Sequence, residues 1–474
     1  MPKHLHPLAI LAKLIDLVRQ FILPWIFVLW TQLHSPRLPL LLILGALLLI
    51  GIALLDYALF TYEFADRAVI INHGIIKRQH EHIPYDRIQT IQQNQAWYMR
   101  PFDLMQLQIE TSGHDKDRPE AVLPVVTASV YAALLKRRNT LQNDATPAIT
   151  PSQPATTYHI KSSDLNTYAL TSQGIIPLLA VIGWLQSRLQ QLDNFLPARF
   201  TNGLNQLMQR STVAGVLSLI IFVLLISLII SYFREIMRFY HFTLSRQEMQ
   251  LTTSRGLLSR NVVSTSITKI QAVAVSQTLI RQLFHLTTLQ VLLASNAASD
   301  EAQHNLVLIP VLKQNKVWSE ISRFTNLNAI KQPNLSTISR AGYWRFVRNS
   351  LLLSLLVVGP CLMWLRPWGY LSLLLFPLAY GLGDYAARNT GFEILQSDNT
   401  IFLQYGKQAQ RRLFIVRRQK IQAISQRQTI WMAKRQLSHL NVFIRSGNHV
   451  EVVQLRYLTR QQSQQVAQWF EVVK

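Results

Sequence analysis

The sequence predicts a multi-pass α-helical membrane protein that carries three small β-rich domains in tandem, each closed by a C-terminal helix. Three observations lead to this fold class. Apolar segments occur in pairs along the chain, one short motif occurs three times, and only 15% of the 474 residues are charged, whereas about a quarter are charged in a soluble domain. The net charge of +23 indicates an anionic partner, and so much apolar sequence makes the membrane the first candidate.

The two clearest membrane segments are 38–60 and 212–233. A bilayer core of about 30 Å needs roughly 20 apolar residues of helix. The first segment has one charged residue, Asp56, and the second has none. Each weaker segment lies beside another segment across a short connector, which favours a spanning helix over a buried core helix. The sequence therefore predicts six spans in three transmembrane hairpins: 14–33 with 38–60, 168–185 with 212–233, and 349–365 with 368–383.

The distribution of basic residues predicts the orientation of these hairpins. The three connectors hold 5 of the 47 basic residues, and the rest lie at the N-terminus, beside the spans or in the large regions between hairpins. Basic residues near span ends favour the cytoplasmic side. We expect the N-terminus and all three large regions to be cytoplasmic, with the N-terminal apolar stretch retained.

A motif recurs once in each of the large regions, and we call it the repeat kernel. It consists of a basic residue, Ile, Gln, any residue, Ile or Val, and a second Gln four residues later. Recurrence in every copy favours a structural role, with the apolar residues in a core and the glutamines bonded to backbone at a bend. The kernel residues are Ile88, Gln89 and Gln95; Ile270, Gln271 and Gln277; and Ile421, Gln422 and Gln428.

The sequence around each kernel predicts a small domain. Alternating apolar residues and a glycine turn precede the kernel, further alternating runs follow it, and an amphipathic helix closes each copy. These patterns predict domains at 62–140, 240–330 and 389–474. A linker at 141–160 is rich in Pro, Ser, Thr and Ala.

Two apolar helices followed by a domain with this kernel resemble the bacterial pleckstrin-homology-type membrane proteins, the membrane-flanked domain or YdbS/YdbT-like family. The stretches "RQLFHL" and "YMRPFDL" carry the resemblance best, while "WMAKRQLSHL" in the third copy is longer. The resemblance covers nearly the whole chain. It implies PH-like domains, each a bent β-sandwich or partly open barrel closed by a C-terminal helix, and no enzymatic activity.

The residues themselves also give no catalytic or cofactor motif. No P-loop, GxSxG or HExxH sequence occurs, and Cys361 is the only cysteine. We interpret His80, His82 and Asp86 as an exposed strand edge rather than as zinc ligands, because a zinc site needs three or four convergent ligands. We expect no enzyme, no cofactor and no metal.

The third copy carries most of the basic charge. The net charge rises from +1 in 62–140 to +4 in 240–330 and +9 in 389–474. A basic residue near an anionic leaflet contributes about 1 kcal/mol. We expect nonspecific attraction to headgroups, ahead of a defined lipid or protein pocket, and a solvated basic face is the alternative. The candidate contacts are Lys407, Arg411, Arg412, Arg417, Arg418, Lys420, Arg427, Lys434 and Arg435.

The function predicted from these features is a non-enzymatic interaction scaffold on the cytoplasmic face of the cell membrane, in the context of envelope stress or resistance. The expected partners are anionic lipids of the inner leaflet and another membrane protein of the same family, in a homo- or hetero-oligomer. One alternative is a lipid-handling or transport protein. The other is a membrane-tethered nucleic-acid binder, which the membrane anchor and the lack of a known binding module disfavour.

Overall fold

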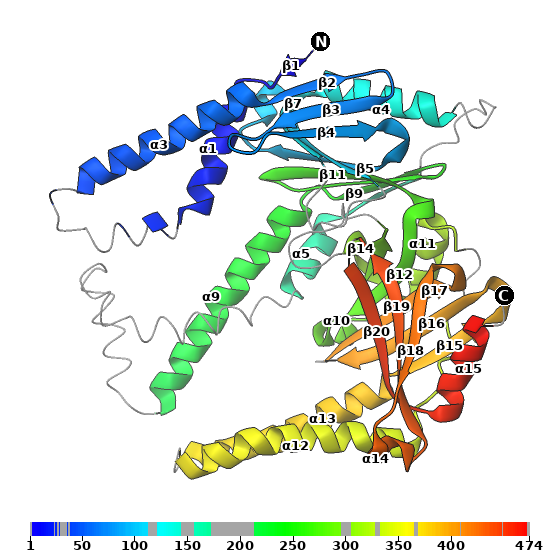
Figure 1. Cartoon of the computed structure of the whole chain (residues 1–474). Helices are drawn as coiled ribbons and strands as arrows, with labels where there is room; N and C mark the ends of the chain where they lie inside the picture. Colours follow the sequence, from blue (N-terminus) through cyan, green and yellow to red (C-terminus); the bar gives the residue numbers. More distant parts are fainter. Residues whose placement is uncertain are drawn as a thin grey trace.

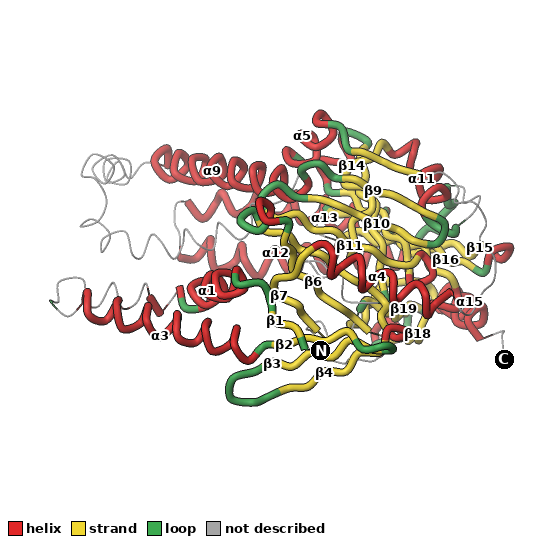
Figure 2. Tube along the Cα trace, turned by 90° about the horizontal axis from the view of Figure 1, so that it is seen from above, coloured by secondary structure: helices red, strands yellow, loops and turns green. Residues whose placement is uncertain are grey.

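The computed structural model describes residues 2–22, 24–25, 28, 36, 38–111, 121–143, 156–171, 213–294, 305–327, 332–364, 368–407, 409–447 and 449–471. Three β-rich domains follow one another from the N-terminus to the C-terminus (Figure 1). The long helices leave these domains on one side, as the view from above shows (Figure 2).

The first domain combines a four-stranded sheet, β1-β2-β3-β4, with the strands β5, β6 and β7. Helix α4 closes it, and Tyr85, Ile71 and Leu107 are fully buried in its core. Its elements are β1 (Lys3–His4), β2 (Thr61–Phe64), β3 (Ala68–His73), β4 (Gln79–Pro84), η1 (Tyr85–Arg87), β5 (Ile88–Ala96), η2 (Arg100–Phe102), β6 (Leu104–Thr111), β7 (Ala121–Thr127) and α4 (Ala128–Asn143).

The second domain repeats this order and begins before its long apolar helix. An edge strand, β8, pairs with β9, just as β1 pairs with β2 in the first domain. Its elements are β8 (Thr156–His159), α5 (Ser162–Leu170), α9 (Val213–Phe239), β9 (Thr243–Gln247), β10 (Gln250–Arg255), β11 (Ser259–Ser266), η3 (Ile267–Lys269), β12 (Ile270–Gln277), α10 (Leu279–Leu283), β13 (Leu286–Leu293), β14 (Asn305–Lys313), η5 (Gln314–Lys316) and α11 (Val317–Phe324).

The third domain follows the helix pair α12 and α13 and has two corresponding sets of strands, but its first set has three described strands and no edge strand like β1 or β8. Helix α15 closes it. Its elements are α12 (Arg340–Trp364), η6 (Trp368–Leu374), α13 (Leu375–Arg388), β15 (Gly391–Leu395), η7 (Gln396–Asp398), β16 (Thr400–Lys407), β17 (Gln410–Arg417), η8 (Arg418–Lys420), β18 (Ile421–Arg427), α14 (Ile430–Ala433), β19 (Leu437–Ser446), β20 (His449–Thr459) and α15 (Arg460–Glu471).

The sheets do not stop at the domain boundaries. Strand β5 of the first domain pairs with β11 of the second, giving a seven-stranded sheet in the order β7-β6-β5-β11-β10-β9-β8. Strand β12 of the second domain pairs with β17 of the third, giving a six-stranded sheet in the order β14-β13-β12-β17-β16-β15. Each junction therefore uses the kernel strand of one domain and the last strand of the first sheet of the next.

The second junction also joins two hydrophobic cores. Successive side chains of a strand point to opposite faces of its sheet. Along β12, Val273 and Val275 lie in the core of the second domain, while Ala272 and Ala274 lie in the core of the third. The first junction is more polar, since Gln92 to Gln95 of β5 lie opposite Val263 to Arg260 of β11. The second and third domains thus share a buried sheet, and the first is joined mainly by backbone.

The prediction of six membrane spans is wrong for the described residues, where two helices are long and apolar enough to cross a bilayer. They are Leu38–Leu59, which is α3, and Arg340–Met363 within α12. In the predicted span 212–233, residue 212 and the side chains of residues 213–224 lie outside what the structure describes. Helix α1 (Leu8–Gln20) has 13 residues and helix α13 has 14, or about 20 Å each at the α-helical rise. Both are shorter than the hydrocarbon core of a bilayer.

Packing explains why these segments differ from the prediction. Helix α1 buries Ala9 and Ala12 in the core of the first domain, and Lys13 Nζ lies 3.0 Å from Asp56 Oδ2 of α3. It is an amphipathic helix on the domain, with charged residues that do not suit lipid. Most of segment 168–185, the connector that follows it and residues 144–155 of the predicted linker lie outside the described residues, as do ten of the residues between 23 and 35.

A candidate site between the last helix pair and the third domain

The second glutamine of each repeat kernel makes the same hydrogen bond. The side-chain amide donates to the backbone carbonyl nine residues ahead, from Gln95 to Leu104 at 3.1 Å, from Gln277 to Leu286 at 2.9 Å and from Gln428 to Leu437 at 2.8 Å. The residue before each acceptor has a left-handed backbone: Asp103, His285 and Gln436, with φ of 51°, 52° and 52°. The longer third copy therefore keeps the same bend after its kernel strand.

The other kernel residues lie at the start of the same strands. Ile88 and Ile421 are 3% and 7% exposed, and Ile270 packs against the core of the second domain. Gln271 donates to the carbonyl of Lys269 at 3.2 Å, and Gln422 is exposed at the open side of β18. Gln89 lies in β5.

Three of the nine predicted basic contacts instead bridge the second and third domains. Both Nε and a terminal nitrogen of Arg411 donate to Gln277 Oε1, the former at 2.9 Å. Arg417 donates to the carbonyl of Asn326, and Lys420 Nζ donates to the carbonyl of Thr268 at 3.2 Å. Burial lowers the pKa of the Arg411 guanidinium. These three cations stabilise the junction.

The remaining six basic residues lie in different surroundings. Arg418 donates to the carbonyl of Phe470 at 3.1 Å and lies over the Trp469 ring of α15. Arg412 is half-buried, and Lys407 is exposed at the end of β16. The other three are exposed on and beside α14: Arg427, Lys434 and Arg435. The structure therefore divides the predicted basic face into a junction set, a pocket residue, an exposed group at α14 and two half-buried residues, Arg412 and Arg418.

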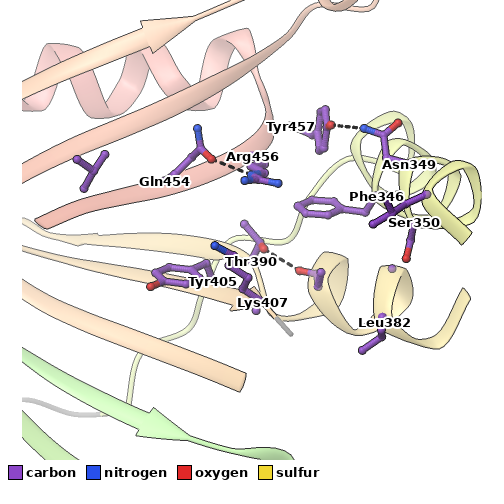
Figure 3. A pocket seen from close by; sticks show the side chains of 15 residues that line it. Phe346, Asn349, Ser350, Leu382, Thr390, Tyr405, Lys407, Gln454, Arg456 and Tyr457 are labelled. Carbon is purple, nitrogen blue, oxygen red and sulfur yellow. Dashed lines mark hydrogen bonds between the residues drawn. The ribbon is translucent and has the colours of Figure 1, made fainter. Parts of the chain in front are cut away.

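A pocket of about 470 Å³ lies where helices α12 and α13 meet strands β16 and β20 (Figure 3). One side is apolar and comes from the helices, and the other carries the basic residues Lys407 and Arg456 on the strands. Among the described residues that line it there is no carboxylate and no histidine. The lining residues are Phe346, Asn349, Ser350, Leu353, Leu382, Gly383, Ala386, Thr390, Tyr405, Gly406, Lys407, Val452, Gln454, Arg456 and Tyr457.

Close helix packing positions the apolar side of the pocket. A Cβ on Gly383 would lie 2.8 Å from the Cα of Val347, so glycine lets α13 approach α12. At the same level, Tyr343 of α12 donates to Asp384 Oδ1 at 2.8 Å. Arg388 Nε donates to the same carboxylate oxygen at 2.7 Å. The close approach at Gly383 and the bond from Tyr343 to Asp384 hold the two helices together just before α12 becomes continuously apolar.

Tyr457 joins the strand side of the pocket to α12. Its hydroxyl accepts a hydrogen bond from Asn349 Nδ2 at 2.7 Å, and its ring meets Phe346 edge-on at 5.0 Å. Its φ of 56° is in the left-handed region, which costs an ordinary residue free energy. Beside it, Arg456 Nε donates to Gln454 Oε1 at 2.8 Å. The strained backbone at Tyr457 thus coincides with the point where the domain holds the membrane helix.

His439 supports Tyr457 and should make the third domain sensitive to acid. Nδ1 of His439 accepts the backbone N–H of Tyr457 at 3.2 Å, which requires the neutral imidazole. Burial, and then Arg456, lowers the pKa of His439 below 6.5. Since the unfolded chain binds the proton more readily, stability is full above about pH 6.5 and falls as the pH drops toward the folded-state pKa. We expect the Tm of the full chain in detergent to fall over this range.

The variant His439→Asn should flatten that acid-dependent decrease in Tm. His159→Asn, at an exposed position on β8, is the control and should leave the pH dependence unchanged. An equal pH dependence of Tm in the wild type and in His439→Asn would show that this histidine does not couple protonation to folding.

Exposed apolar side chains follow each kernel strand. The residue two positions after the second kernel glutamine is Trp97, Leu279 or Ile430, with exposed fractions of 65%, 54% and 78%. In the third domain, Trp431 is 69% exposed, and its carbonyl accepts a hydrogen bond from Arg345 of α12 at 3.3 Å. Exposed tryptophan beside lysine and arginine is typical of the membrane–water interface.

Sequence reasoning found Lys407 and the kernel glutamines but missed Arg456 and Tyr457 as pocket residues. Both lie on β20, beyond the 407–435 stretch that drew attention by its charge. The alternating run in "VEVVQLRYL" predicts a strand, but the side of the domain that meets α12 depends on the packing of the helix pair.

Comparison with known proteins agrees with the repeated architecture. The family model of the bacterial PH domain matches three stretches, residues 14–140, 176–325 and 350–472. The UPF0699 transmembrane protein YdbT of Bacillus subtilis (strain 168) is 26% identical over 495 residues, covering 100% of this chain and 99% of that protein. Two described helices, α3 and α12, are long and apolar enough to cross a bilayer, which agrees with this similarity.

Proposed function

The chain belongs to the bacterial PH domain family, as its repeat kernel predicts, and from this premise we propose that it is a non-enzymatic scaffold on the cytoplasmic face of the membrane. Its three domains would present one continuous surface to partner proteins, while the third domain binds an anionic lipid headgroup. Envelope stress or resistance is the physiological context that belongs to this proposal.

The observation that carries the proposal is the pocket between α12 and the third domain. Its lining changes from leucine to lysine and arginine over the width of one cavity, as a phospholipid changes from acyl chain to phosphate. A cation near an anionic leaflet contributes about 1 kcal/mol. Lys407 and Arg456 can hold a phosphate, and the apolar helix side can hold the start of the acyl chains.

The exposed group at α14 supports the same placement. Ile430 and Trp431 can insert at the headgroup level, where Lys434 and Arg435 meet anionic lipid. The contact from Arg345 fixes α14 beside the first turns of α12. The pocket and the α14 group therefore both lie at the domain end of one membrane helix.

Continuous sheets support the scaffold part of the proposal. Because β5 pairs with β11 and β12 with β17, the domains cannot rotate independently without breaking a strand ladder. The helices leave on one side, so all three domains would face the same compartment (Figure 2). The basic residues beside the membrane segments favour the cytoplasm.

Headgroup binding predicts that the double variant Lys407→Gln/Arg456→Gln loses its preference for anionic lipid. We expect the dissociation constant for phosphatidylglycerol to rise about 5- to 30-fold, since two favourable charge contacts are removed. Native mass spectrometry of the full chain in detergent, titrated with phosphatidylglycerol or with phosphatidylcholine, measures this preference.

Lys316→Gln/Arg323→Gln is the matched control, because it removes the same charge from the second domain away from the pocket. The control should keep the anionic preference of the wild type. The headgroup assignment is refuted if the pocket variant and the control retain phosphatidylglycerol equally.

A further inference from the structure

The chain leaves two strand edges unpaired that are equivalent to edges paired inside it. Kernel strands β5 and β12 pair with the next domain, whereas the third kernel strand, β18, pairs only with β19 among the described strands. Strand β4 occupies the place of β11 and β17, and within the described chain it pairs only with β3. The third domain thus ends in an unpaired kernel-strand edge, β18, and the first domain carries the kind of strand, β4, that pairs with such an edge inside the chain.

The two internal junctions have the same register. Arg260 lies opposite Gln95 in the first junction, and Arg411 lies opposite Gln277 in the second. Each of these arginines precedes the next kernel isoleucine by ten residues, and Arg78 precedes Ile88 by the same ten. The register that the chain uses twice would therefore place Arg78, just before β4, opposite Gln428, just after β18.

The edge of β18 has the features of a pairing edge. In β12, Ala272 and Ala274 are 2% and 1% exposed because β17 and the core of the third domain cover them. The equivalent Ala423 is exposed and Ser425 is half-buried. All three kernel strands carry the same register shift one residue after the kernel isoleucine, and in β5 and β12 this shift does not prevent pairing. Small side chains at these positions leave room for a neighbouring strand and its core.

The edge of β4 can serve as the partner strand. Gln79, His80 and His82 are exposed, while Ile83 is fully buried in its own core. Pro84 cannot donate to a ladder, but it lies one residue beyond the stretch that the shared register would pair. A proline there does not block the pairing.

We propose that β18 of one copy pairs antiparallel with β4 of a second copy, joining chains head to tail along the membrane. The paired residues would run from Ala423 opposite Ile83 to Gln428 opposite Arg78. A second copy is the occupant because the same chain carries both halves of the contact, in the register of its own junctions. Both internal steps keep the helices on one side, so a further step of the same kind keeps the second copy in the same membrane (Figure 2).

Side-chain chemistry agrees with this pairing. Gln428 uses its amide for Leu437, which leaves Oε1 for a donor, and Arg78 is exposed. In the second internal junction, Gln277 Oε1 accepts from Arg411 in this arrangement. Ser425 would lie opposite Glu81, and Arg427 would lie diagonally across from Glu81. Opposite charges on neighbouring strands attract each other, so the contact between Arg427 and Glu81 favours this register. Lipid binding at the pocket is independent of this contact, so each proposal can fail without the other.

Cysteine cross-linking of full-length chains tests the pairing and its register. In a Cys361→Ser background, a chain with Gln79→Cys is mixed with a chain with Arg427→Cys in one set of nanodiscs or micelles and oxidised. The proposed register places these residues directly opposite each other. We expect a disulfide-linked heterodimer on a non-reducing gel, at least about ten times more abundant than with Gln426→Cys, whose side chain points to the other face of the strand.

The chain supplies its own positive control. Ser276 lies opposite Arg412 in the second internal junction, at the positions equivalent to Arg427 and Gln79. The variant Ser276→Cys/Arg412→Cys should form a disulfide within one chain. The proposal is overturned if this control cross-links and the 79/427 pair does not, if 426 cross-links to 79 equally well, or if the control itself fails, because the shared register would then be wrong.

Charge variants at Ser425 give a second test that needs no cross-link. Ser425→Glu would place like charges opposite each other at Glu81, whereas Ser425→Lys would place opposite charges there. We expect an about 2- to 5-fold weaker self-association for the glutamate variant than for the lysine variant. Equal dissociation constants, measured by mass photometry of the full chain in nanodiscs, would contradict the register, and assemblies formed only with another protein would contradict a second copy as occupant.

Discussion

Replacing Ala274 by glutamate is expected to unfold the second and third domains together. Ala274 is 1% exposed and lies in the core of the third domain although it belongs to a strand of the second. A carboxylate there would be buried beside Phe414 and Val416, and burying an unpaired charge costs more than about 4 kcal/mol. We expect loss of the folded state of both domains, measured by limited proteolysis and by thermal unfolding of the full chain in detergent.

Ser425→Glu is the matched control for this variant. Ser425 occupies the equivalent position of β18, whose other edge is paired with no described strand, so the carboxylate can reach water. We expect a change in unfolding free energy within about 0.5 kcal/mol, as for most surface substitutions. If Ala274→Glu resisted protease as well as Ser425→Glu does, the shared core would not exist as described.

The second large effect is expected from Gln277→Ala. Gln277 is 3% exposed, donates to Leu286 and accepts from Arg411. Its loss leaves a buried carbonyl and a half-buried guanidinium without their partner, and burial already lowers the pKa of Arg411. Hydrogen bonds to charged groups contribute about 1.5–3 kcal/mol, so we expect a loss of about 2–4 kcal/mol in unfolding free energy.

The variant Gln428→Ala separates the two roles of Gln277, the bond to the backbone and the bond to Arg411. Gln428 makes the same bond to the backbone, to Leu437 at 2.8 Å, but it is exposed and lies at no junction within the chain. We expect a loss of about 1 kcal/mol, measured by denaturant unfolding of monomeric protein in detergent. Equal losses for the two glutamines would mean that the contact with Arg411 adds nothing.

The repeated kernel and the alternating runs around it were enough to predict three β-rich domains closed by helices. The joined sheets were not predicted, although the sequence held a signal. The run "AVAV" in β12 is apolar at successive positions, as in strands buried on both faces, whereas β5 reads "TIQQ" and β18 reads "AISQ". We assigned each kernel to the core of a single domain, and that assignment does not explain why both faces of β12 are apolar.

The candidate site was predicted only in part, because the sequence shows where charges are dense but not which way each side chain points. Charge density identified the stretch from Lys407 to Arg435, but neighbouring residues of a strand point to opposite faces. These residues also lie on different elements, so Arg411 of β17 meets the second domain, Lys407 of β16 the pocket and Lys434 after α14 the solvent, while Arg456 enters the pocket from the distant strand β20. Length and hydropathy likewise overpredicted the spans, because they do not show that α1 uses its apolar face to cover a domain.

The shared sheet also constrains the order of events while the protein is made. Strand β12 leaves the ribosome long before β17, and the candidate spanning helix α12 lies between them in the chain. Until then the apolar edge of β12 is unpaired, and an exposed edge of this kind is prone to mispairing. Delayed insertion of α12 should therefore expose the nascent chain to proteases and chaperones at β12 rather than at the third domain itself.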